Sequence, residues 1–191
     1  MKREYKEIYA RMRALVTAPA EEWARIFREP VEERRLMVGH LIPCAAFFSA
    51  VSIPVGLINH SIWQAAGTAF IHFTASAAGT YAAYRLVQEY MRGKMEEWRE
   101  TALPLTVYSA EMFIAFRSIG AALGNVFVGQ LFMLASLFFI HILYVGVQAL
   151  EEVPGNQRTN LLVIASLSII SLPTIIHQVL AMLFGMTAGR V

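Results

Sequence analysis

The stretch 36–84 constrains the fold most strongly, because its 49 residues contain no Lys, Arg, Asp or Glu. One membrane crossing needs about 20 apolar residues at a rise of about 1.5 Å each, so the stretch is too long for a single span. Its centre holds a polar run at 59–61. The pattern therefore predicts a helical hairpin in a membrane, with one span over 36–58 and a second over 62–84.

The rest of the chain also has the composition of an all-α membrane protein. Of its 191 residues, 57% are hydrophobic and 16% are charged, against about 25% charged in a soluble domain. Three further apolar segments predict spans at 103–123, 126–150 and 161–184. The predicted architecture is a polytopic bundle of five transmembrane helices over 36–185, preceded by a cytosolic or interfacial segment over 1–35.

The segment 1–35 contains a basic amphipathic helix. Within 3–16, apolar groups recur at helical spacing at Tyr5, Ile8, Tyr9, Met12, Leu15 and Val16. Such a helix either lies on the surface of an anionic bilayer or packs on loops of its own protein, and both interpretations stay open. The first 30 residues are charged throughout, so we expect an uncleaved first span rather than a signal peptide.

The basic residues predict the orientation. Nine Lys and Arg lie in the N-terminal segment, four in the connector 85–100 and one in a polar loop at 151–160. Arg190 alone falls on the opposite side of the predicted spans. Because cytoplasmic loops are enriched in Lys and Arg, the N-terminus is expected in the cytoplasm and the C-terminus outside.

Two charged residues fall inside the third predicted span. A charge at the centre of a span costs about 2.5–3.5 kcal/mol on insertion scales, so Glu111 and Arg117 each need a partner. They stand about 9 Å apart along one helix and point in different directions, so they do not pair with each other. Equal depth predicts two polar layers: Glu111 with His72 or His141, and Arg117 with Gln130, His177 or Gln178.

This polar network has a functional and a structural interpretation. It is either a proton relay or metal path, or a set of interhelical hydrogen bonds worth about 0.6–2 kcal/mol each. No HxxxH or HxxE spacing places two metal ligands on one helical face, so no metal site is predicted. Ser109 and Cys44 lack a His–acid set, so no catalytic residue or cofactor is predicted. The net charge of +2 suggests no nucleic-acid partner.

Small residues indicate where helices pack closely, and tryptophans indicate the membrane interface. Small residues that allow close helix packing are Ala75, Gly79, Ala83, Gly120 and Gly124. They pack helices within one chain or between copies in a homo-oligomer, and both interpretations stay open. Trp23, Trp63 and Trp98 are interpreted as marks of the membrane interface.

An ordered set of residues runs through most of the chain. The first part comprises Pro19, Glu22, Trp23, Glu29, Pro30, Gly39, Ile42 and Pro43. The second part is Val107-Tyr108-Ser109 and Leu143-Tyr144-Val145-Gly146. Over residues 7–185 this order resembles bacterial members of the Yip (Ypt-interacting-protein) domain family. The family often continues after Tyr-Ser with a small residue and Pro, whereas this chain has Ala110, Glu111 and Met112, so the usual bend of the third span is in doubt.

The resemblance implies a non-enzymatic integral membrane protein. Eukaryotic relatives bind small GTPases of the Rab class and act in vesicle traffic. The long N-terminal region of those relatives is missing here, which favours a bacterial cytoplasmic membrane, where such GTPases do not occur. The expected function is membrane organisation or interaction with lipids and other membrane proteins. The alternative is a small carrier or channel that uses Glu111, Arg117 and the intramembrane histidines; an intramembrane enzyme is the least favoured interpretation.

Overall fold

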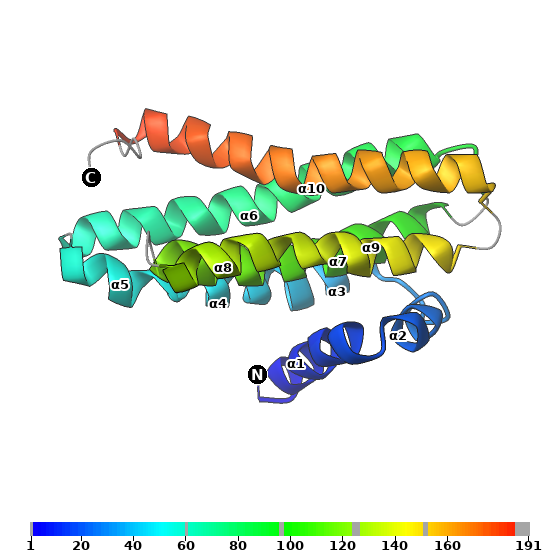
Figure 1. Ribbon diagram of the computed structural model, residues 1–191, viewed down its shortest axis with the longest axis horizontal. Coiled ribbons are helices and arrows are strands. Elements are labelled where there is room, and N and C mark those ends of the chain that lie inside the picture. The colour runs from blue at the N-terminus through cyan, green and yellow to red at the C-terminus, as the bar shows by residue number, and fades with distance from the viewer. Residues whose placement is uncertain (1, 60, 96–97, 124–126, 151–152, 186–191) are drawn as a thin grey trace.

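The chain is described by a computed structural model over residues 2–59, 61–95, 98–123, 127–150 and 153–185. Within these residues all regular structure is helical, and no strand occurs. Figure 1 shows the long helices side by side in a bundle, with two N-terminal helices below one end of it. This confirms the all-α class.

The N-terminal helices are α1 (Lys2–Thr17) and α2 (Pro19–Ile26), and Pro19 lies in the first turn of α2, where its missing N–H is harmless. α1 buries Ile8 and Leu15, at 8% and 0% exposure, but leaves Tyr9 and Val16 exposed. Its buried face is therefore narrower than the predicted one. α1 contacts α2 and the start of the first predicted span, so Ile8 and Leu15 pack on the protein itself.

The first predicted span is built from several helical segments. They are α3 (Glu33–Leu36), the π-helical η1 (Met37–Leu41), α4 (Ile42–Ala50) and α5 (Ser52–Asn59). The wide π turn comes just before Pro43, whose ring would clash with the carbonyl of Gly39 in a regular α-helix. A second irregularity at Val51 precedes Pro54. The two prolines thus explain both departures from a single straight helix.

The next two helices are longer than the predicted spans. α6 (Ile62–Met91) begins with a capping box, in which Ser61 and Gln64 satisfy each other's backbone N–H groups. α6 and α7 (Trp98–Leu123) take in most of the charged connector predicted at 85–100. In the predicted turns at 59–61 and 124–125, positions 60, 124 and 125 lie outside the described residues.

The last two predicted spans also differ from the structure. The fourth is divided into α8 (Phe127–Ala135), the 3₁₀-helical η2 (Ser136–Phe138) and α9 (Phe139–Gln148). At the division, the Ser136 hydroxyl donates to the carbonyl of Met133 at 2.6 Å and so competes with regular helix bonding. α10 (Gly155–Leu183) starts directly after Pro154 and continues through Pro173. The prediction of a polar loop at 151–160 is therefore wrong from residue 155 onwards.

Three helical segments within the described residues are long and apolar enough to cross a membrane: Glu33–Pro54, Phe127–Gln148 and Gly155–Leu183. α6 and α7, with 30 and 26 residues, have the length to span but are less apolar. α7 can be more polar because all residues from 101 to 115 are buried by the surrounding helices. The predicted number of five crossings is therefore not confirmed. Three segments that are able to cross a membrane are confirmed.

The small residues pack helices within the chain. A Cβ atom on Gly79 would lie 2.5 Å from the Cα of Pro173, so α6 and α10 cross in direct backbone contact. Ala75 and Ala83 are buried along the same helix. A Cβ atom on Gly120 would lie 2.9 Å from the carbonyl oxygen of Gly129 in α8. Gly124, predicted to belong to this set, lies outside the described residues.

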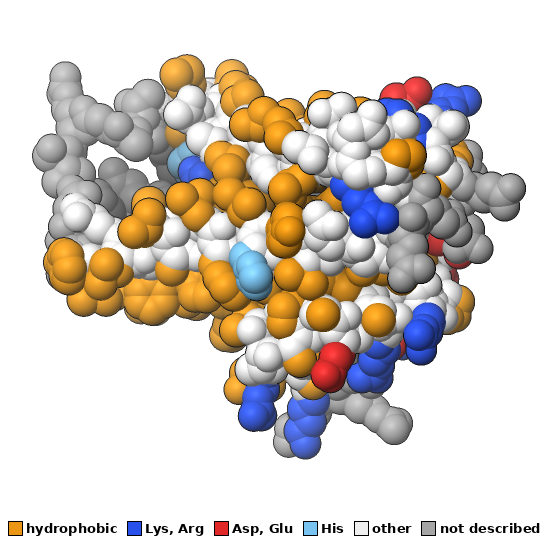
Figure 2. Space-filling view, turned by 45° about the vertical axis from the view of Figure 1, so that its right-hand side comes forward, with side chains coloured by type: hydrophobic (Ala, Val, Ile, Leu, Met, Phe, Trp, Pro, Cys, Tyr) orange, Lys and Arg blue, Asp and Glu red, His pale blue; other side chains and the backbone are white. Residues whose placement is uncertain are grey.

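Charged and apolar side chains are separated on the surface. Figure 2 shows hydrophobic side chains over much of the bundle, whereas charged side chains gather at the lower edge, near α1 and α2, and at the right-hand end of the bundle. Large apolar groups such as Phe127, Leu167 and Met182 are exposed at 70%, 62% and 68%. A lipid environment accounts for such exposure, because lipid tails solvate apolar side chains that water does not.

Candidate functional site

A buried tryptophan attaches the N-terminal helices to the bundle. Trp23 of α2 is 0% exposed, and its Nε1 donates to the carbonyl of Ile142 in α9 at 2.9 Å. Its indole fills the space beside Gly146, where a Cβ atom would come within 2.7 Å of the ring. The interpretation of Trp23 as an interface residue is therefore wrong, whereas Trp63 is 82% exposed.

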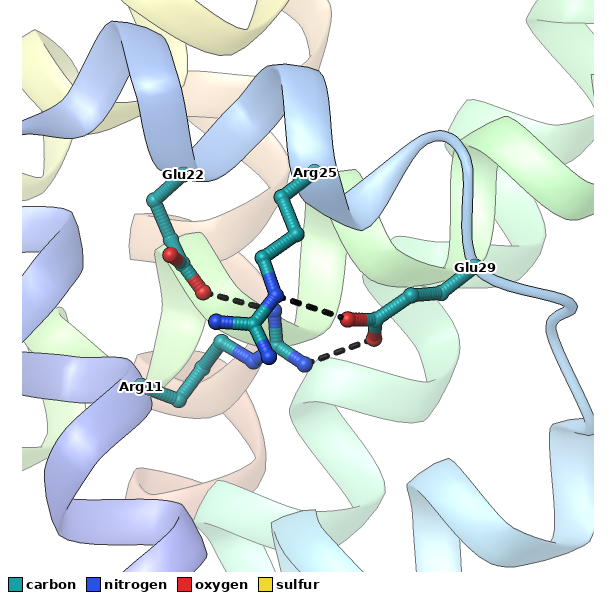
Figure 3. Close-up of polar contacts among 4 residues, drawn as sticks. All are labelled: Arg11, Glu22, Arg25 and Glu29. Atoms are coloured by element: carbon teal, nitrogen blue, oxygen red, sulfur yellow. Dashed lines mark hydrogen bonds and ion pairs between the residues drawn. The ribbon is translucent and has the colours of Figure 1, made fainter.

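An ionic cluster holds α1, α2 and the segment after α2 together (Figure 3). The guanidinium of Arg11 contacts Glu22 and Glu29 at 2.6 Å each, and Arg25 contacts Glu29 at 3.2 Å. Burial disfavours the charged form of Arg11, but Tyr108 and the two carboxylates outweigh burial and raise the pKa of Arg11 above its ordinary value. Arg11 therefore stays charged, and both of its terminal nitrogens are occupied by carboxylates of this cluster.

A cavity of about 630 Å³ lies between these N-terminal helices and the start of the first span. Its charged and titratable lining is Arg11, Arg25, Arg35, Glu22, Glu29, Glu32, His40 and Tyr108. Its volume falls within the range of about 300–1,000 Å³ that is typical of small-molecule sites. Arg35 and Glu32 are exposed and form no ion pair within the described part of the chain. The cavity therefore offers one cation and one carboxylate that are not already paired.

The floor of this cavity leads to the buried carboxylate of α7. His40 of η1 lines the cavity, and its Nδ1 lies 2.6 Å from Oε1 of Glu111, which is 0% exposed. The predicted pairing of Glu111 with His72 or His141 is wrong. His40 stands near the start of the first predicted span and was not among the residues that the depth count assigned to this layer. His141 is exposed and lies against Phe138 instead.

The second predicted polar layer is correct in part. Arg117 donates to Oγ1 of Thr174 at 2.8 Å, and it shares a small cavity with His177 and with His72, which was assigned to the other layer. The rings of His72 and His177 lie 4.5 Å apart between centroids. Gln130 and Gln178 are exposed and do not line this cavity. Sequence spacing missed Thr174, because a threonine one turn from His177 carries no distinctive signal.

The described residues contain no group of three or more His, Cys or acidic residues placed to hold a metal ion. The hydroxyl of Ser109 is buried and has no hydrogen-bond partner there, so no neighbouring base activates it. No family model, curated protein or solved structure matches this chain. Its function must therefore be argued from the cavity and the polar pairs.

Proposed function

We propose that this chain is a non-enzymatic integral membrane protein of the Yip type that crosses a bacterial cytoplasmic membrane five times. The excess of Lys and Arg in and before the 85–100 connector supports a cytoplasmic N-terminus and an external C-terminus. α6 and α7 have the length of spans, and burial of α7 by its neighbours reduces the need for an apolar surface.

Three residues of the Yip-like pattern meet in space, which supports the proposed type. The rings of Trp23 and Tyr108 lie 6.3 Å apart between centroids, and Gly146 makes room for the indole. Trp23 stands 85 residues before Tyr108 and 123 before Gly146, but the three residues share one task, which is to fix the N-terminal helices to the bundle. In this chain, these three residues of the pattern therefore have a common structural role.

The function that the cavity supports best is binding of a zwitterionic lipid headgroup at the cytoplasmic surface. The observation that carries it is the pair of unpaired charges, Arg35 and Glu32, beside a cavity of about 630 Å³. They flank the residue at which the first membrane-compatible segment begins, Glu33, and thus lie at headgroup level. A headgroup that carries a phosphate and an ammonium group can pair with both charges. Such binding is one form of the lipid interaction expected for this protein.

Lipid retention tests this function. The doubly neutralised variant Glu32→Gln/Arg35→Gln is expected to lose most of the zwitterionic phospholipid that the wild-type protein retains in mild detergent, as counted by native mass spectrometry. The matched control is Glu89→Gln/Arg92→Gln, which neutralises an exposed pair of the same two charges on α6. The control should retain lipid like the wild type. Equal retention in all three proteins would contradict headgroup binding in the cavity.

The second candidate function is a small carrier or channel, and the buried His40–Glu111 pair beside the cavity favours it. A transport path would have to continue from His40 past Glu111 towards Arg117. Single cysteines at positions 40 and 111, in a Cys44→Ala background, report whether water follows that path. We expect a membrane-impermeant thiol reagent to label position 40 but not position 111, because Glu111 is 0% exposed. Labelling of position 111 from both sides of the membrane would favour the carrier.

A further inference from the structure

Among the described residues, Arg117 is a cation within the bundle that has no carboxylate partner. It lies on α7, and among the described residues its contacts are a hydrogen bond to Oγ1 of Thr174 at 2.8 Å and the ring of Phe113 at 5.3 Å. Glu111, the acidic residue six positions earlier, is held by His40. The positive charge of Arg117 is therefore not neutralised by any described side chain.

Neither contact of Arg117 replaces a negative charge. The Thr174 hydroxyl donates its hydrogen to the carbonyl of Ile170 at 2.6 Å, so it offers Arg117 a neutral oxygen. The face of an aromatic ring attracts a cation but carries no net charge. Charged residues in membrane spans normally pair with an opposite charge or face water, because burial of a lone ion is costly. The described side chains therefore supply no negative charge to Arg117, so an anion or water from outside them completes the site.

A small cavity lies beside Arg117 and is surrounded by hydrogen-bond donors. Its volume is about 20 Å³, and its polar lining is Arg117, His72, His177, Ser76 and Ser118. None of its lining residues is acidic. Within the described part of the chain, the ring nitrogens of His72 and His177 have no hydrogen-bond partner, although the two rings lie 4.5 Å apart. Room for one water needs about 10–15 Å³, so the cavity fits a single small species.

We propose that this cavity binds one small monovalent anion of the size of chloride. The anion pairs with Arg117 and accepts hydrogen bonds from the N–H groups of His72 and His177. It links α6, α7 and α10, which carry these three residues, and so stabilises the centre of the bundle. The site is separate from the lipid cavity and does not depend on the function proposed for it.

Thermal unfolding of the full chain in an uncharged detergent tests the proposal. Chloride is titrated against gluconate at constant ionic strength, so that screening does not change. The unfolding midpoint should rise with the logarithm of the chloride concentration, and by about 3–6 °C once chloride reaches about ten times its dissociation constant. Bromide should act like chloride because the two ions have similar size and the same charge.

Variants assign the response to this site. Arg117→Gln should abolish the dependence on chloride, and His72→Leu and His177→Leu, which remove the N–H donors, should move the titration to higher chloride concentration. The control, Arg85→Gln, removes an exposed arginine on α6 that contacts Tyr81, and it should respond like the wild type. If Arg117→Gln does not fold, the titrations of the two histidine variants decide whether chloride binds at this cavity.

Three outcomes would overturn the proposal. Equal unfolding midpoints in chloride and gluconate would mean that the cavity holds water. A chloride response that survives in Arg117→Gln, or is unchanged in both histidine variants, would place the anion elsewhere. Stabilisation by an anionic phospholipid added to the micelles, without any response to chloride, would identify the negative charge as a lipid phosphate.

Discussion

Replacing Trp23 with alanine is expected to lower the free energy of unfolding by about 3–5 kcal/mol, the usual cost of removing a fully buried large aromatic side chain. Trp23 is 0% exposed, and the change also leaves the carbonyl of Ile142 without its indole donor. Because Gly146 has no side chain with which to fill the gap, a cavity remains between α2 and α9. Chemical denaturation in detergent measures the loss.

A matched substitution separates this effect from the general loss of a tryptophan. Trp63→Ala removes a side chain that is 82% exposed, and it should change the free energy of unfolding by less than about 0.5 kcal/mol. In Trp23→Ala, α2 should also detach, so trypsin should cleave at Arg25 and Arg28 faster than in the wild type. Similar small effects of both substitutions would mean that α2 is not held by its indole.

The second large effect is expected at Gly79. A glycine-to-alanine change inside a helix normally stabilises a protein by about 0.5–1 kcal/mol. At Gly79 the sign should reverse, because the new Cβ atom would lie 2.5 Å from the Cα of Pro173. Backbone cannot move aside as a side chain can, so α6 and α10 must separate. We expect a loss of about 1–3 kcal/mol, measured as a lower unfolding midpoint of Gly79→Ala.

The same substitution at Gly155 is the control. A Cβ atom on Gly155 would meet nothing within 4 Å, and this glycine stands at the start of α10, the same helix that carries Pro173. Gly155→Ala should be neutral or slightly stabilising. If Gly79→Ala were as stable as Gly155→Ala, the close crossing of α6 and α10 would not exist in solution.

The sequence by itself determined the helical class and the membrane character of the chain. Both follow from local properties, since the length of an uncharged apolar run sets the number of turns that can lie in lipid. Prolines also act locally, so the irregular course of the first span can be traced to Pro43 and Pro54. The charge of Glu111 and Arg117 was enough to predict that each has a partner or a cavity.

Only the tertiary structure decided which residues those partners are. Depth along the membrane is one coordinate, and several side chains share each level, so it could not distinguish His40 from His72 as the neighbour of Glu111. Trp23 reached the core because α2 folds back on α9, a contact across 119 residues. Such contacts depend on the packing of whole helices, which no local pattern records.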